Sequence, residues 1–166
     1  QDQLFQTGDR VCFIGNSITM NGKYFKYLEL FYATRFPDRK ILFYNCGISG
    51  DDAGGMLRRL NSDVFIHKPT KAVLMVGMND VRSSLYKKET LNDPASKQKK
   101  ENALQDYYKN VDSIVRLLMQ YGCKVILQTP TIYDQTSTIH EENHFGVNDA
   151  LKKCADFLEK LARKYS

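Results

Sequence analysis

FIGNSIT, residues 13–19, ends an apolar run at a glycine and places a serine two residues further on. The run begins at Arg10, so its apolar part (RVCFIG, 10–15) has the length of a β-strand. A serine at such a strand exit can cap the helix that follows, or it can act as a nucleophile. The segment alone leaves both interpretations open.

Three further runs of the same kind occur along the chain: ILFYNC (41–46), AVLMVG (72–77) and KVILQTP (124–130). Their hydrophobicity is nearly continuous and does not alternate, which is typical of strands that are covered on both faces. Strands of this kind belong to parallel sheets, so the four runs together predict a parallel sheet.

Helical periodicity fills the intervals between these runs. It predicts helices over 22–36, 51–65, 96–122 and 147–165, and Gly122 is a suitable residue to end the third of them. Strands and helices therefore alternate four times. Right-handed crossovers then predict a three-layer α/β fold in a single domain over residues 1–166.

The first predicted helix carries a group of large apolar side chains. Its spacing predicts one buried face, made of Tyr24, Tyr27, Leu28 and Phe31. We expect this face, like the apolar stripes of the other helices, to pack in the core.

Composition limits the partners and the location of the protein. The net charge is +5, but acidic residues are interspersed with the lysines of 86–110, which indicates a solvated helix face and no nucleic-acid partner. No apolar run approaches the roughly 20 residues that cross a bilayer, so no membrane span is expected. The first residues, QDQLFQTGDR, have no initiator Met and no apolar signal core. We therefore expect a processed or trimmed N-terminus, and a secreted or periplasmic location after signal removal is one option.

The four cysteines are expected to be buried free thiols, because no CxxC or Cys/His spacing typical of a metal site is present. They are Cys12, Cys46, Cys123 and Cys154. The sequence predicts neither a metal nor an organic cofactor.

The residues that follow the predicted strands form a chemically coherent set. Ser17 follows the first strand, Gly50 lies in the glycine-rich turn after the second, and Asn79 follows the third. Ligands of open parallel sheets bind at the carboxyl ends of the strands. Acyl transfer needs a nucleophilic oxygen and donors that hold the oxyanion, and a glycine amide can approach that oxyanion closely.

With these residues in place, the chain resembles the GDSL esterases and lipases, also called SGNH hydrolases. FIGNSIT, NCGISGDDAGGMLRRL and VLMVGMND are similar to three blocks of that family, in the same order. The resemblance implies a three-layer α/β/α flavodoxin-like fold with Ser17 as nucleophile. It also implies an oxyanion hole made of the Ser17 and Gly50 N–H groups and the Asn79 side chain. The usual Gly-Asp-Ser is here Gly-Asn-Ser, which keeps a hydrogen-bonding side chain at Asn16 and loses its charge.

The catalytic base has no counterpart at the expected place. The family carries an Asp-x-x-His block after a fifth strand, and this chain ends before such a strand. We therefore expect a fragment that lacks its last strand and its base. Among the histidines present, His67 precedes the third strand, at the wrong end of the sheet. His140 and His144 lie in the loop after the fourth strand, where Glu141 and His144 could form a substitute dyad or a histidine could contact substrate.

Three acidic residues near these blocks have simpler interpretations. Asp51 and Asp52 are expected to begin a helix, where acidic side chains favour the helix dipole. Asp80 is expected to cap the segment that follows it.

Thr19, in the first block, is expected to have a structural role only.

The leading hypothesis is a serine ester hydrolase that acts on a small-molecule or carbohydrate ester. Acetylated sugars, lipids and thioesters are substrates in the family that the chain resembles. One alternative is a non-catalytic carbohydrate- or ligand-binding domain that keeps the fold without the base. Another is a flavodoxin-like cofactor binder in which the GNSIT segment holds a phosphate. The sequence leaves the oligomeric state open.

Overall fold

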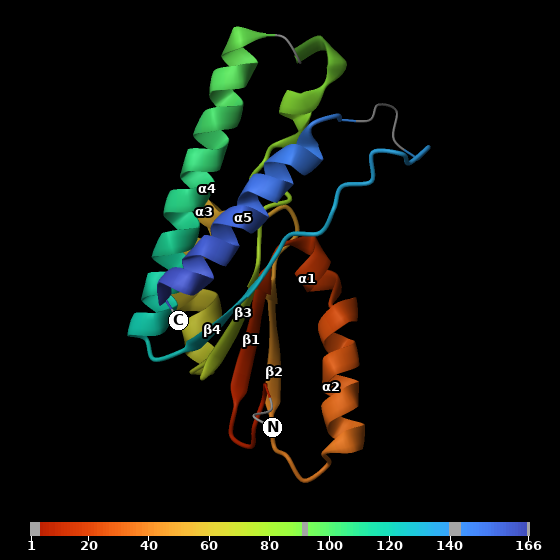
Figure 1. Cartoon of the computed structure of the whole chain (residues 1–166). Helices are drawn as coiled ribbons and strands as arrows, with labels where there is room; N and C mark the ends of the chain where they lie inside the picture. The colour runs from red at the N-terminus through yellow and green to blue at the C-terminus, as the bar shows by residue number, and fades with distance from the viewer. Residues whose placement is uncertain (1–3, 91–92, 140–143, 166) are drawn as a thin grey trace.

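The protein is an α/β domain with one central parallel sheet (Figure 1). This computed structural model describes residues 4–90, 93–139 and 144–165. All four predicted strands form, and the sheet order is β2-β1-β3-β4 with every pair parallel. The strands are β1 (Arg10–Gly15), β2 (Leu42–Gly47), β3 (Lys71–Met75) and β4 (Lys124–Gln128).

The register of the sheet aligns the carboxyl ends of the strands. Gly15, the last residue of β1, pairs with Gly47 on β2 and with Met75 on β3, and Met75 pairs with Gln128 on β4. The loops that follow the four strands therefore all begin at the same end of the sheet, where the carboxyl ends of the strands lie. Ser17, Gly50 and Asn79 all lie in these loops or just beyond them.

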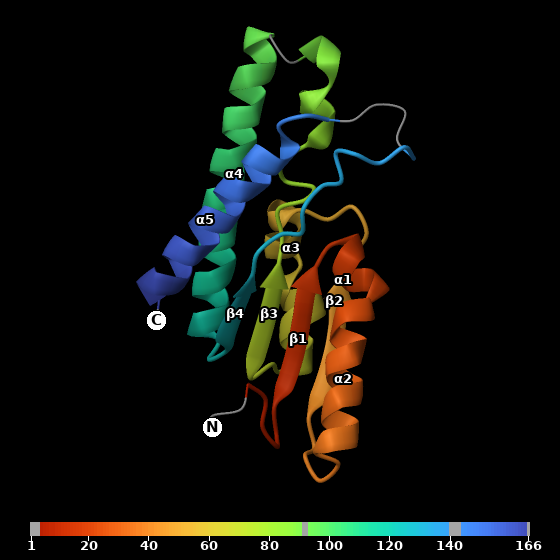
Figure 2. The same cartoon turned by 45° about the vertical axis from the view of Figure 1, so that its right-hand side comes forward.

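Helices cover both faces of the sheet, as Figure 2 shows. One face holds α2 (Lys23–Arg35), which packs on Val11, Phe13 and Val73. The other face holds three helices that share a core with Cys12, Ile14 and Leu74. These helices are α3 (Ala53–Arg58), α4 (Pro94–Gln120) and α5 (Val147–Tyr165). Successive residues of β1 and β3 are thus buried on opposite faces, which explains the continuous hydrophobicity of both strands.

The buried face of α2 differs from the prediction. Phe25 and Tyr32 are buried, whereas Tyr27 and Phe31 are 72% and 49% exposed. The helix carries apolar residues all round, so periodicity does not single out one stripe. Contacts with other elements select the face: the ring of Phe25 stacks on Phe13 of β1 at 4.7 Å.

The helix predicted over 51–65 is also shorter than expected. The α-helix α3 ends at Arg58, and a π turn, η1 (Leu60–Val64), and a 3-10 turn, η2 (Phe65–His67), follow it. The predicted helix at 96–122 begins earlier, at Pro94, because Asp93 accepts hydrogen bonds from the Ala95 and Ser96 N–H groups. The segment before it contains two further 3-10 turns, η3 (Ser83–Tyr86) and η4 (Lys88–Thr90).

Several smaller predictions are confirmed. Gly122 follows α4 in the left-handed conformation at φ 96°. All four cysteines are free and buried. Thr19 is fully buried, and its hydroxyl shares a hydrogen bond of 3.1 Å with the Tyr24 hydroxyl. As a separate observation, none of the helices in the described ranges has the length and apolar character that a bilayer span needs.

Strand β4 lies at an edge of the sheet, as β2 does, and it is less buried than the interior strands β1 and β3. It pairs with β3 on one side only, and its apolar residues are half-buried where the prediction had them covered on both faces. Within the described residues, its outer edge carries no further strand.

Candidate active site

Ser17 is the first residue of α1 (Ser17–Asn21), which begins directly after β1. The cap of this helix is Asn16, whose Oδ1 accepts a hydrogen bond of 3.0 Å from the Ile18 N–H. The interpretation of Ser17 as the helix cap is therefore wrong. Within the described part of the chain, no hydrogen bond occupies the Ser17 hydroxyl.

Two glycines let α1 lie directly on the strand ends. A Cβ on Gly15 would collide with the Thr19 hydroxyl and would lie 2.9 Å from the Met75 carbonyl oxygen. A Cβ on Gly47 would collide with the backbone of Met20. The strands and α1 can approach this closely only because both positions lack a side chain. The close contact sets the height of Ser17 above the sheet.

Gly50 presents its backbone to open space. Its φ of +75° lies in the left-handed region that favours glycine, and no atom lies within 4 Å of a Cβ built on it. The turn is closed by a hydrogen bond of 3.2 Å from the Asp51 N–H to the Ile48 carbonyl. Among the described residues, no acceptor faces the Gly50 N–H. This amide is therefore available to a ligand.

Asn79 is tied to the same turn. Its Nδ2 donates a hydrogen bond of 2.8 Å to the Asp51 carbonyl oxygen, one residue after Gly50. A primary amide carries two N–H donors on that nitrogen, so one donor stays available. The loops after β2 and β3 thus place two candidate oxyanion donors, the Gly50 amide and the Asn79 side chain, next to each other.

Asp80 makes a second link between these loops. Its Oδ1 accepts a hydrogen bond of 2.8 Å from the N–H of Ala53, the first residue of α3, while its buried Oδ2 has no partner among the described residues. The prediction that Asp80 caps the following segment is wrong, because the contact reaches back 27 residues. Burial raises the pKa of Asp80 to about 6, and the negative charge of Asp52 adds to this shift.

The two acidic residues before α3 have different roles. Asp52 caps α3 by accepting a 2.8 Å hydrogen bond from the Gly55 N–H, as predicted for the start of a helix. Asp51 forms an ion pair with Arg59, with 2.7 Å between Oδ2 and Nε. Sequence analysis missed Arg59. Its one signal was a cation eight positions after an acid, inside the apolar pattern of MLRRL.

Residues 13–166 match the sequence model of the GDSL-like Lipase/Acylhydrolase family. The chain belongs to this family. A comparison with curated protein sequences found no significant match. The matched range includes all three sequence blocks, and with them Ser17, Gly50 and Asn79.

Solved structures with the same fold support this placement. A gut microbial diltiazem-metabolizing enzyme, BT4096, matches with a TM-score of 0.85 and 31% identity over 96% of this chain. A catalytic mutant of the acetylxylan esterase Axe2 from Geobacillus stearothermophilus matches with a TM-score of 0.77, 21% identity and 98% coverage. LAE5, an alpha/beta hydrolase enzyme from the metagenome of Lake Arreo, Spain, matches with a TM-score of 0.75, 23% identity and 96% coverage. The chain spans 36% of BT4096 and 75% of each of the other two. The flavodoxin-like α/β prediction is confirmed.

The histidines do not complete the site in the described part of this family member. His67 stacks on Tyr44 at 4.1 Å in the turn before β3, at the opposite end of the sheet, as expected. His140 lies outside the described residues. The ring of His144 lies parallel to that of Tyr133 at 6.1 Å, and its buried Nδ1 has no partner among the residues described. Both views show the start of α5, just after His144, well apart from α1 (Figures 1 and 2). The assignment of His140 or His144 as the base stays a prediction.

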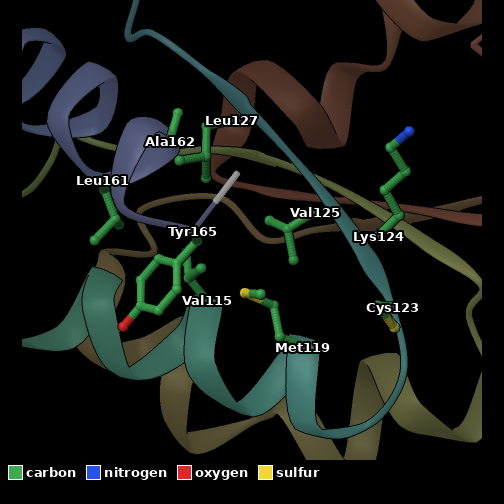
Figure 3. Close-up of a pocket in the computed structure, with 9 residues that line it drawn as sticks. All are labelled: Val115, Met119, Cys123, Lys124, Val125, Leu127, Leu161, Ala162 and Tyr165. Carbon is green, nitrogen blue, oxygen red and sulfur yellow. The ribbon is translucent and has the colours of Figure 1, made fainter.

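An apolar pocket lies elsewhere in the fold. It has a volume of about 390 Å³ and lies beside β4, at the carboxyl ends of α4 and α5 (Figure 3). Its lining is Val115, Met119, Cys123, Lys124, Val125, Leu127, Leu161, Ala162 and Tyr165. A second cavity of about 380 Å³ continues along α5 toward its start, between that helix and residues 129–132. Neither cavity is lined by Ser17, Gly50 or Asn79.

Within the described ranges, no group of three or more His, Cys, Asp or Glu side chains is arranged to hold a metal ion. The three candidate groups of Ser17, Gly50 and Asn79 are a hydroxyl, a backbone amide and a carboxamide, which suit an oxyanion better than a cation.

Proposed function

We propose that this domain is the nucleophile-bearing part of a serine ester hydrolase. The observation that carries the proposal is the position of Ser17: it stands at the start of α1 with its hydroxyl unoccupied in the described chain, because Asn16 takes over the capping role. The family match over residues 13–166 supports the same assignment. In the structures that resemble the domain, catalytic mutants of Axe2 include one in which a serine is replaced by alanine.

The chemistry assigned to the site is acyl transfer in two steps. The Ser17 Oγ attacks the ester carbonyl carbon while a base takes its proton, and the carbonyl π electrons move to the oxygen. The Ser17 and Gly50 N–H groups and the free Asn79 N–H hold this oxyanion. Its collapse expels the alcohol, which receives the proton, and water then hydrolyses the acyl-enzyme by the same route. Each oxyanion donor is worth about 10²–10³ in rate.

A short-chain acyl ester, on a carbohydrate or another small molecule, is the proposed substrate. Axe2, which shares the fold, is an acetylxylan esterase. Gly50 is exposed, and no atom lies within 4 Å of a Cβ built on it, which fits a substrate that approaches from solvent. We assign no particular sugar and no particular acyl group.

The base is proposed to come from outside the described residues. One source is His140 in the loop after β4. The other is a segment after α5 that adds a fifth parallel strand beside β4. The unpaired edge of β4 and the two cavities along α5 support that second source. Helix α5 also shares its core with α4, so it lies on the face from which a right-handed crossover would reach that edge.

Hydrolysis of an activated acetate ester, such as 4-nitrophenyl acetate, tests the proposal. We would compare the wild-type chain with Ser17→Ala, and use Ser113→Ala, at a half-buried position of α4, as the matched control. Turnover that is lost in Ser17→Ala and kept in Ser113→Ala supports the nucleophile and places a base within the chain. Equal rates for all three proteins, both in this chain and in a longer form that continues past residue 166, would overturn it.

The second candidate function is a ligand-binding domain without catalysis. It is favoured by one observation: none of the described histidines contacts Ser17, Gly50 or Asn79. Acetylated xylo-oligosaccharide would then shift the amide resonances of Ser17 and Gly50 without being hydrolysed. Release of acetate from the same ligand would exclude this alternative.

A further inference from the structure

The guanidinium of Arg59 joins the two backbone segments that carry Ser17 and Gly50. Its Nη2 donates a hydrogen bond of 3.3 Å to the carbonyl oxygen of Gly15, two residues before Ser17. Its Nε donates a hydrogen bond of 2.7 Å to the Asp51 Oδ2, one residue after Gly50. One side chain therefore spans from the end of β1 to the turn after β2.

The ion pair between Arg59 and Asp51 is largely buried. The side chains of Arg59 and Asp51 are each 11% exposed, and Arg59 Nη1 also contacts Asp63 Oδ2 at 3.4 Å. The other oxygen of Asp51 accepts a hydrogen bond of 3.1 Å from the Asp52 N–H. Gly55 makes room for this carboxylate, since a Cβ at that position would collide with Oδ1 of Asp51.

A buried ion pair is weak evidence for a stabilising role. Desolvation of the two charges offsets much of their attraction, and replacing such a pair by apolar groups is often neutral. The pair instead fixes the relative position of two acceptors, because the planar guanidinium holds both at set angles and a lysine cannot do so. The geometry of Arg59 is better explained by positioning than by stability.

The position of Asp51 matters for both candidate oxyanion donors. Gly50 precedes it directly, and its carbonyl oxygen accepts the 2.8 Å hydrogen bond from Asn79 Nδ2. A shift of Asp51 would therefore move the Gly50 amide and change the orientation of the Asn79 carboxamide together. Displacements of about 1 Å at such donors can cost on the order of 10²-fold in rate.

We propose that Arg59, through its ion pair with Asp51 and its hydrogen bond to Gly15, is a positioning residue that sets the Gly50 and Asn79 donors relative to Ser17. It touches no substrate in this assignment. The effect of Arg59 on catalysis rests on the proposed function. Its effect on the positions of Gly50 and Asn79 can be measured without turnover.

The first test uses backbone and side-chain amide resonances in ¹⁵N-labelled protein. Arg59→Met is compared with Arg58→Met, since Arg58 is the exposed arginine that directly precedes Arg59 at the end of α3. We expect Arg59→Met to shift the Gly50 amide and the Asn79 side-chain NH₂ well beyond the Arg58→Met values, while resonances of β3 and α4 stay in place. Shifts at Gly50 and Asn79 no larger than those in Arg58→Met would overturn the proposal.

Two further variants separate positioning from loss of the fold. Asp51→Asn with Arg59→Met removes both charges at once, so no unpaired charge stays buried. Arg59→Lys keeps the charge but cannot hold Gly15 and Asp51 together. We expect the double variant to fold and to show the same displaced resonances, and Arg59→Lys to restore them only in part. A double variant with wild-type resonances at both donors would refute the proposal even if Arg59→Met alone did not fold.

Turnover, where it is found, gives a second readout. Oxyanion donors stabilise the transition state more than the bound substrate. If Arg59→Met displaces them, kcat should fall about 10- to 100-fold while KM stays within about twofold. A wild-type chain that hydrolyses no ester, alone or extended past residue 166, would count against the proposed function, while the amide resonances would still decide the positioning role. An active wild type with unchanged kcat in Arg59→Met would count against positioning alone.

Discussion

The side-chain amide of Asn79 donates a 2.8 Å hydrogen bond to the backbone carbonyl of Asp51, and this bond joins two loops that are 28 residues apart in sequence. It leaves the second Nδ2 hydrogen available next to the exposed Gly50 amide. The turn after β2 and the loop after β3 therefore behave as one unit at the edge of the sheet.

Replacing Asn79 by alanine should remove one donor and release the Gly50 turn. We expect a fall in kcat of about 10²–10³, because the donor acts on the oxyanion that develops in the transition state. Steady-state hydrolysis of an activated acetate ester measures this, with Asn61→Ala as control because Asn61 is an exposed asparagine of η1. A comparable loss in Asn61→Ala would show that the effect is not specific to the site.

Asp80→Asn should change how stability depends on pH. The folded-state pKa of Asp80, about 6, lies above its ordinary value of 3.8, so the folded protein binds more protons than the unfolded chain between these two values. The stability that Asp80 contributes is thus present at low pH and is lost as pH rises through about 6, by about 3 kcal/mol in total. Asparagine can still accept the Ala53 N–H hydrogen bond but does not titrate.

Urea denaturation of both proteins from pH 4 to pH 8 measures this difference. The stability of Asp80→Asn relative to wild type should rise as pH increases from 4 to about 7 and then level off. The groups that face Asp80, namely Asp52, Tyr107 and Cys154, are the same in both proteins. Their contribution largely cancels in the comparison. A relative stability that does not vary with pH would mean that Asp80 does not titrate in this range.

Asn16 and Ser17 should respond differently to alanine. Asn16 is buried and caps α1, so Asn16→Ala should lower the free energy of unfolding by about 0.5–2 kcal/mol. Ser17→Ala removes a hydroxyl that has no partner in the described chain, and should change stability by less than about 0.5 kcal/mol. Thermal or urea unfolding distinguishes them. Equal losses in the two variants would indicate that Ser17 shares the capping role.

Gly55 and Gly54 form a matched pair in α3. A Cβ on Gly55 collides with the Asp51 carboxylate, so Gly55→Ala should destabilise the protein by about 1–3 kcal/mol and disturb the Gly50 amide. A Cβ on Gly54 comes no closer than 3.3 Å to any atom, and its neighbours are ends of side chains. Alanine also favours a helix over glycine by up to about 1 kcal/mol, so Gly54→Ala should be nearly neutral. Urea unfolding of both variants tests this, and a larger loss in Gly54→Ala would contradict it.

The site could be predicted in part because its candidate residues follow directly from the strands. A parallel sheet brings the carboxyl ends of its strands to one edge, so Ser17, Gly50 and Asn79 could be placed near each other from chain order alone. Their hydrogen bonds could not be predicted. Asp80 accepts a hydrogen bond from Ala53, 27 residues away in sequence, and Arg59 donates one to Gly15, 44 residues away. At such sequence separations, local sequence carries no signal.

The sequence by itself determined the strands, their parallel arrangement and the residues at the strand ends, because continuous apolar runs and glycine turns are local features of the chain. Only the tertiary structure decided which face of α2 is buried, which side chain caps α1 and how Arg59 ties Gly15 to Asp51. Those outcomes depend on which groups meet in space. Burial makes an unpaired polar group costly, so most buried donors and acceptors are held by partners that the fold brings to them, although the Asp80 Oδ2 and the His144 Nδ1 have none among the described residues.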